Sequence, residues 1–136
     1  MSDEYFSEGV SDLLKCESER AAVIFAFSVI ESMVSDLINL KTRHPKSYSQ
    51  LSMQVKLNLL HEMNEITDLE YESISWLRKQ RNKAAHSPGF VVDKTQIQDR
   101  WIMQDLRGLG PLQKYLITVV GSFWNSRPEL RANFDT

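Results

Sequence analysis

The sequence predicts an all-α fold, an antiparallel bundle of about five helices in a single domain that covers residues 1–136. Apolar residues recur at spacings of three and four through the long stretches, which is the period of an amphipathic helix. No stretch shows the sustained alternation of apolar and polar residues that is typical of a half-buried strand. Helix-breaking residues are sparse, with five glycines and four prolines, so the segments between them are long enough to form helices.

The N-terminal part of the chain carries the strongest helical pattern. A short lead helix is expected within residues 1–17, from about Glu4 to Lys15, and a long helix from Ser18 to about Thr42. The apolar residues of the long helix cover an unusually broad face: Val23, Ile24, Phe27, Ile30, Met33, Val34, Leu37, Ile38 and Leu40. A face of this breadth is typical of the centre of a bundle or of a helical dimer interface. We therefore expect a homodimer, since twofold dimers are the commonest assemblies.

The middle of the chain predicts two further helices. After a polar connector over residues 47–52, apolar residues from Met53 to Met63 fall mostly on one side of a helix. The next helix begins at Thr67, because a threonine three residues before Glu70 has the spacing of a capping box, in which each side chain bonds the backbone amide of the other residue. Acidic residues fill its first turns and basic residues its last, an order that complements the helix macrodipole. A Ser-Pro-Gly sequence at 87–89 ends it.

The last third of the chain contains two shorter helical patterns. An amphipathic segment follows a looser stretch and includes these apolar residues: Ile97, Trp101, Ile102 and Leu106. A final helix is expected from Leu112 to about Trp124, and residues 125–136 are expected to form a tail. Three tryptophans fall within helical patterns and are interpreted as core or interface anchors: Trp76, Trp101 and Trp124.

Composition and charge restrict the classes of function. Sixteen basic and eighteen acidic residues give a formal net charge of −2, which argues against binding DNA, RNA or a membrane through bulk positive charge. Cys16 is the single cysteine, and no Cys/His cluster has the spacing of a zinc site. The acidic N-terminus is unlike a signal peptide, and the apolar run from Ala21 to Ile30 is too short for a membrane span. We therefore expect a cytoplasmic protein without a metal, a cofactor or a membrane anchor.

The most informative segment is the basic end of the helix that begins with the capping box. Arg78, Lys79, Arg81 and Lys83 place four cations in six residues, and His86 follows them. One interpretation is structural, because cations at a helix C-terminus meet carbonyl groups that lack an intrahelical partner. The alternative is a functional site, in which these residues bind a partner.

Three residues of this segment have the side chains needed for metal-free phosphoester chemistry on RNA. Asn82 and His86 are four residues apart and point to one side of a helix, whereas Arg81 is displaced by about 140° from His86. Arg81 and His86 converge only in a cleft that wraps the helix end, or across a twofold axis. There the imidazole would exchange a proton with the 2′-hydroxyl or the leaving oxygen, and the guanidinium would hold the charge that develops on phosphate.

The six residues from Arg81 to His86, Arg-Asn-Lys-Ala-Ala-His, resemble the Arg-polar-x-x-x-His signature of the higher-eukaryote and prokaryote nucleotide-binding (HEPN) superfamily. Its members are small α-helical bundles, and many are ribonucleases. The resemblance implies catalytic roles for Arg81 and His86, supported by Asn82. One nucleotidyltransferase-partnered branch has a Tyr two residues after the His; Pro88 occupies that position here, so the self-modification chemistry of that branch is not implied.

A wider stretch resembles the mannitol operon repressor family, a helical relative of that superfamily. The resemblance is carried by Leu51-Ser52, Val55-Lys56-Leu57, Glu70-Tyr71-Glu72, Leu77-Arg78 and Ala85-His86-Ser87, with a weaker echo in the apolar helix that carries Glu31. Proteins of this family are regulators that act by protein contact, and they are not generally regarded as nucleases. This resemblance implies a regulatory protein without catalytic activity.

Glu31 is the other polar residue with a candidate role. It lies on the side of Phe27 and Val34 in the most apolar helix, where a carboxylate is costly to bury without a partner. Either it reaches the edge of the apolar face and stays hydrated, or it pairs with a buried cation, for which Arg81 or Arg78 is the best candidate.

Three functions follow from these observations. The first is a non-catalytic interaction protein that binds a protein partner as a regulator, or as an inhibitor of the immunity type; the excess of acidic residues favours it, because negative charge steers a protein onto a basic partner. The second is a metal-independent endoribonuclease of the toxin or defence type, a dimer in which Arg81 and His86 of both chains line one cleft. Direct DNA binding ranks last, because no helix-turn-helix pair with a basic second helix is visible.

Overall fold

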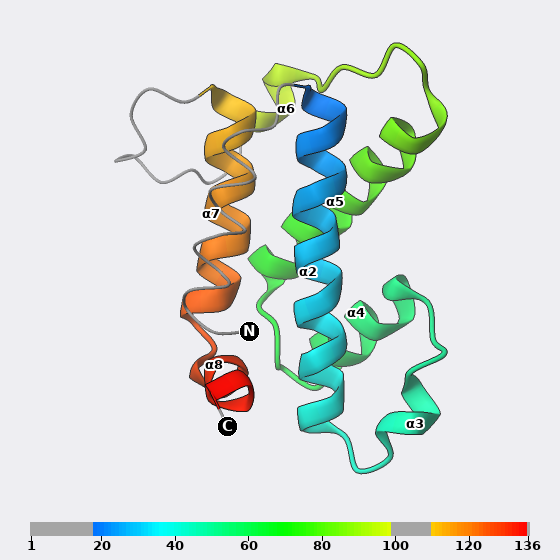
Figure 1. Ribbon diagram of the computed structural model, residues 1–136, viewed down its shortest axis with the longest axis vertical. Helices are drawn as coiled ribbons and strands as arrows, with labels where there is room; N and C mark the ends of the chain where they lie inside the picture. The colour runs from blue at the N-terminus through cyan, green and yellow to red at the C-terminus, as the bar shows by residue number, and fades with distance from the viewer. Residues whose placement is uncertain (1–17, 99–109, 136) are drawn as a thin grey trace.

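The fold is an all-α bundle, as the helical periodicity predicts. The computed structural model describes residues 18–98 and 110–135, and within these ranges it contains seven helices and no strand. The helices are α2 (Glu19–Lys41), α3 (Pro45–Tyr48), α4 (Met53–Glu62), α5 (Asp68–His86), α6 (Lys94–Gln98), α7 (Pro111–Asn125) and α8 (Pro128–Asp135) (Figure 1). The predicted lead helix within 1–17, and the part of the amphipathic segment beyond residue 98, lie outside the described residues.

Helix α2 is the central element: α7 runs beside it, α5 crosses it at an angle, and α3, α4 and α8 pack against its C-terminal end (Figure 1). Ser18 caps it, since the Ser18 hydroxyl accepts a hydrogen bond from the Ala21 amide at 3.0 Å. The helix predicted from Ser18 to about Thr42 is therefore confirmed. Two residues assigned to its apolar face, Ile24 and Leu40, are instead exposed.

The apolar character of α2 is accounted for by burial inside the bundle. By length and composition alone, α2 could cross a membrane. The sequence argument counted only Ala21 to Ile30 as apolar, and it fails when the whole helix is considered. However, half of its apolar stretch is buried against other helices, and the core helix of a bundle satisfies the same criteria.

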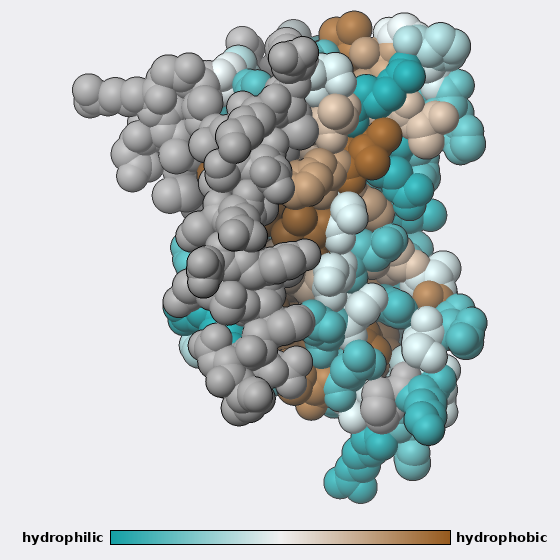
Figure 2. Space-filling model, in the orientation of Figure 1, coloured by the Kyte–Doolittle hydropathy of each residue, from teal (hydrophilic) through white to brown (hydrophobic). Residues whose placement is uncertain are grey.

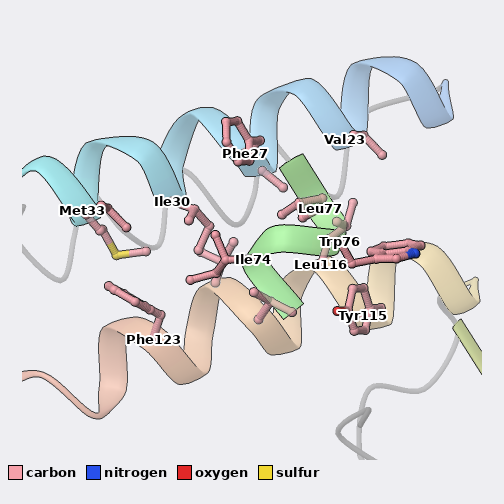
Figure 3. Close-up of a cluster of buried hydrophobic side chains, with 14 of the residues drawn as sticks. Val23, Phe27, Ile30, Met33, Ile74, Trp76, Leu77, Tyr115, Leu116 and Phe123 are labelled. Atoms are coloured by element: carbon pink, nitrogen blue, oxygen red, sulfur yellow. The ribbon is translucent and has the colours of Figure 1, made fainter. Parts of the chain in front are cut away.

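Side chains from α2, α5 and α7 form the centre of the core (Figure 3). Phe27, Ile30 and Met33 of α2 meet Ile74 of α5 and Phe123 of α7, and all five are at most 2 % exposed. Burial of each such side chain contributes about 1.5–3 kcal/mol to the stability of the fold.

Trp76 and Trp124 are buried, which confirms their interpretation as core anchors; Trp101 lies outside the described residues. The Trp76 ring meets Tyr115 edge-on, with ring centroids 5.2 Å apart. Its indole N–H donates to the Gln96 side chain at 2.8 Å and so ties α6 to α5.

The chain beyond Asn125 forms a helix, so the prediction of a tail over residues 125–136 is wrong. Pro128 begins α8, because proline fits the first turn of a helix, where its missing N–H costs nothing. Leu130 is fully buried and Arg127 is only 5 % exposed. The polar connector predicted over 47–52 is also partly helical, since α3 extends to Tyr48.

Candidate functional site

The basic end of α5 lies beside the N-terminus of α2. We call the residues Arg78, Lys79, Arg81, Lys83 and His86 the cationic end of α5. Arg20 of α2 donates from Nη2 to the backbone oxygen of Ser87, and to that of Pro88 at 2.6 Å. These carbonyls follow the last residue of the helix and have no intrahelical partner, so Arg20 fixes the position of the helix end. A shallow hollow of about 330 Å³ adjoins this contact and is lined by Ser18, Glu19, Arg20, Pro88 and Phe90.

The four cations of the cationic end carry no ion pair within residues 18–98 and 110–135. Lys79 and Lys83 are exposed, and Arg78 is half-buried. The charge of Lys83 acts on Asp93, in the loop after α5. The pKa of Asp93 is lowered mainly by hydrogen bonds from the Thr95 hydroxyl and amide, and to a smaller extent by the charge of Lys83. Apart from this influence of Lys83 on Asp93, the positive charge of this surface has no contact partner of opposite sign in the described part of the chain.

Arg81 differs from its neighbours because it packs inward. Its Cζ atom lies 4.9 Å from the centroid of the Phe27 ring on α2, a geometry in which a cation is attracted to the aromatic face. Its Nε–H is buried and has no hydrogen-bond partner. Arg81 is thus part of the packing between α2 and α5.

The structure does not bring Arg81 and His86 together in one chain. Helix α5 is continuous from Asp68 to His86, so the two side chains leave it about 140° apart. Asn82 and His86 share one side of the helix, as their spacing predicts, with Asn82 half-buried and His86 exposed. Within the described ranges, no hydrogen bond links any two of these three residues. The signature residues therefore do not form a catalytic cluster within a single chain.

Glu31 is exposed on α2, and no ion pair joins it to Arg81 or Arg78 in the described ranges. Of the two alternatives for Glu31, the buried ion pair is therefore wrong. The alternative, a hydrated carboxylate at the edge of the apolar face, is what the structure shows. The aromatic ring of Phe27, one turn earlier in α2, occupies the place that the prediction gave to the carboxylate.

A buried ion pair between Arg127 and Glu70 was not anticipated, because Arg127 was assigned to a tail. Arg127 Nη1 lies 2.5 Å from Glu70 Oε2, and Nη2 lies 2.8 Å from Oε1. The same guanidinium donates to the backbone oxygens of Glu65 and Phe123, and it stacks on the Phe123 ring at 3.9 Å. The only local signal was the capping box, which is confirmed: the Thr67 hydroxyl accepts from the Glu70 amide, and the Glu70 carboxylate accepts from the Thr67 amide.

The environment of Glu70 favours its charged form. Burial on its own would raise the pKa of this carboxyl. Hydrogen bonds from Arg127 and from the Thr67 amide, together with the positive charge of Arg127, outweigh burial and lower the pKa below its usual value.

A second polar cluster that the sequence did not reveal joins α4 to α5. His61 Nε2 lies 2.7 Å from Asp68 Oδ1, and the imidazole stacks on the Tyr71 ring with centroids 4.3 Å apart. The Tyr71 hydroxyl donates to Asn58 Oδ1 at 2.7 Å. His61 is partly exposed. In the ranges that the structure describes, no group of three or more His, Cys, Asp or Glu side chains could hold a metal ion.

Comparisons with known proteins add no family assignment: no family model matches the chain, and no curated protein or solved structure matches it significantly. The resemblances to the HEPN superfamily and to the mannitol operon repressors therefore depend on the residues alone.

Proposed function

We propose that this protein is a non-catalytic helical regulator, similar to the mannitol operon repressors, that binds a protein partner through the cationic end of α5. The observation that carries the proposal is a group of three cations without ion pairs at the surface of this helix end, Arg78, Lys79 and Lys83. On a chain with a net charge of −2, this local charge selects an acidic surface on the partner, because complementary potentials steer and orient association.

An exposed apolar residue in the loop that follows the cations supports a protein as the partner. Val91, in the loop that follows α5, is 72 % exposed. The loop is held against α2, since the Val92 amide donates to the Glu19 carboxylate at 3.2 Å. Protein interfaces combine an apolar centre with a polar rim, and arginine is enriched in them. The basic partner that the overall acidity favoured is therefore replaced in our proposal by an acidic one.

The position of Arg81 weighs against catalysis in a single chain. Its guanidinium rests on Phe27 and its Nε–H is buried, whereas a group that stabilises a phosphate transition state has to present its donors to the substrate. A structural role in the contact between α2 and α5 accounts for what is seen.

A metal-independent endoribonuclease of the HEPN type is the second candidate. It is favoured by one observation, the placement of Asn82 and exposed His86 on the same side of α5. This function requires a homodimer in which the Arg81 of one chain approaches the His86 of the other. For either function we place the protein in the cytoplasm.

The partner proposal is tested with two charge-reversal variants. The protein is used to purify its partner from a lysate of the source cells, and binding of the recovered protein is then measured by calorimetry. Lys79→Glu/Lys83→Glu is expected to weaken binding by at least about tenfold. Arg43→Glu/Lys46→Glu reverses two exposed cations at the opposite end of α2 and is the matched control. Equal affinities for the two variants would contradict the proposal.

The nuclease candidate is tested by incubating the purified protein with total RNA in the presence of EDTA. The regulatory proposal predicts intact RNA with the wild-type protein. Cleavage by the wild type that is lost in His86→Ala would overturn it in favour of the endoribonuclease.

A further inference from the structure

A cavity of about 350 Å³ lies between α5, α7 and α8, on the other side of the bundle from the cationic end of α5. Its floor is apolar, and its lining residues are Glu65, Thr67, Leu69, Glu70, Ser73, Ile74, Val119, Ser122, Phe123, Ser126, Arg127 and Glu129. This volume lies within the range of small-molecule sites, which are mainly apolar with a few converging polar groups. The chain turns after α7 into α8, which lies beyond the C-terminal end of α7 (Figure 1), and Arg127 at this turn contacts Glu70 near the start of α5.

Ser73 presents an unused polar group to this cavity. The residue is 8 % exposed and lines the cavity wall from α5. In contrast to the nearby Ser126 hydroxyl, which donates to the backbone oxygen of Ser122, the Ser73 hydroxyl forms no hydrogen bond with any described residue. The Ser73 oxygen keeps some contact with solvent, so it is available to a hydrogen-bonding group that enters the cavity.

The charges around the cavity sum to one excess negative charge. Glu70 and Arg127 form a neutral pair. Glu65 and Glu129 share the single ammonium of Lys41, at 3.5 and 3.8 Å. Two carboxylates with one cation leave a net charge of −1.

Arg127 cannot serve as an anion site. Both of its terminal nitrogens already donate to Glu70, and also to the backbone oxygens of Phe123 and Glu65. A carboxylate or phosphate entering the cavity would meet three glutamates and no free guanidinium donors on those nitrogens. The cavity therefore disfavours anions.

From this geometry we propose that the cavity binds a small organic monocation, an amine with an apolar body. The apolar body lies against Leu69 and Val119, the apolar lining residues that keep accessible surface, and the ammonium lies toward Glu65 and Glu129. The Ser73 hydroxyl accepts or donates a hydrogen bond to the polar end of the ligand. This site is separate from the proposed partner surface and does not depend on it.

The test uses three probes that share an aromatic body and differ in charge: phenethylamine, phenethyl alcohol and phenylacetate. Each is titrated into the full chain, and binding is followed by amide chemical shifts. We expect saturable binding of phenethylamine with shifts at the cavity residues. We also expect phenylacetate to bind at least about tenfold more weakly, with the alcohol between the two.

Three variants make the test specific. Glu129→Gln is expected to weaken phenethylamine about three- to tenfold without weakening the alcohol, since it removes one charge from the cavity rim. Ser122→Leu fills the cavity and is expected to abolish binding of both. Glu62→Gln, an exposed glutamate on α4 outside the cavity, is the control and is expected to change neither. Circular dichroism confirms that each variant is folded.

Several results would overturn the proposal. They are equal affinity for the amine and the acid, shifts that map outside the cavity, no effect of Glu129→Gln, and no saturable binding of phenethylamine up to about 10 mM.

Discussion

Arg127 connects three separate parts of the chain through one side chain. It pairs with Glu70 at the start of α5, it bonds the backbone of Glu65 in the loop before α5, and it covers the Phe123 ring of α7. A buried ion pair is tolerated when its remaining hydrogen-bonding groups are satisfied, and here they are bonded to backbone carbonyls. Glu70 meanwhile completes the capping box, so one carboxylate stabilises both the helix start and the packing of the C-terminal region.

The lowered pKa of Glu70 predicts a pH-dependent contribution to stability. A carboxyl whose pKa is lower in the folded state stabilises the protein fully above its unfolded value, near 4.5, and the contribution is lost as the pH falls through the folded-state pKa. Glu70→Gln is therefore expected to lower the free energy of unfolding by about 3 kcal/mol at neutral pH, since it leaves Arg127 buried without its partner. The loss relative to wild type should shrink at about pH 3.

Urea unfolding of both proteins at the two pH values measures this difference. Glu62→Gln is the control, because Glu62 is exposed and its replacement should have little effect at either pH. A loss in Glu70→Gln that is the same at both pH values would contradict the assignment.

At the scale of the element, α4 ends in a Schellman motif centred on Asn64. The Asn64 amide donates to the His61 oxygen at 3.1 Å and the Glu65 amide to the Leu60 oxygen at 2.9 Å, which satisfies carbonyls that otherwise lack partners. Asn64 has φ of 59°, in the left-handed region. Asparagine and glycine tolerate this conformation better than other residues.

Asn64→Ala is therefore expected to lower the free energy of unfolding by about 1 kcal/mol, because alanine is strained at positive φ. Asn64→Gly should retain most of the stability, since glycine carries no Cβ. Urea unfolding of the two variants separates the backbone effect from loss of the exposed side chain. Equal destabilisation by both substitutions would show that the amide side chain, rather than the backbone conformation, matters here.

Elements with local signals were the predictable ones. The capping box and the acidic-to-basic order of charges are contained within α5 itself, and they predicted both its start and its end. α8 has only Pro128 as a local start signal, and its packing depends on Arg127 meeting a glutamate 57 residues earlier. The same reason explains why the sequence left two alternatives open for Glu31: periodicity assigned it to a side of α2, but not to a partner. The sequence identified the candidate residues at the end of α5 as a group. It could not predict that Arg81 packs inward on Phe27, because that contact depends on where α2 lies relative to α5.

At the scale of the whole molecule, the described buried side chains form one core. The cluster includes residues from α2, α4, α5, α6, α7 and α8, which supports a single cooperative unit. The broad apolar face of α2 packs against the other helices of this core. The homodimer that we inferred from this face stays a prediction. On the face seen in Figure 2, hydrophobic side chains gather near the N-terminal half of α2, and hydrophilic ones surround α3.

A single core predicts one cooperative unfolding transition. Tryptophan fluorescence, which reports the packing around Trp76 and Trp124, and far-ultraviolet circular dichroism, which reports helix content, should give the same urea midpoint. Two separate midpoints would indicate that α7 and α8 unfold independently of α2 and α5. That result would also mean that the cavity between them opens before the core is lost.

The long reach of the Arg127–Glu70 pair has a consequence for synthesis on the ribosome. Chains fold from the N-terminus as they emerge, so a nascent chain that extends only through α5 carries Glu70 without its guanidinium and the apolar α2 without the cover of α7. Such an intermediate exposes the apolar residues of α2 that α7 covers in the complete fold. We therefore expect translation arrest before α7 to yield a chaperone-dependent, protease-sensitive polypeptide.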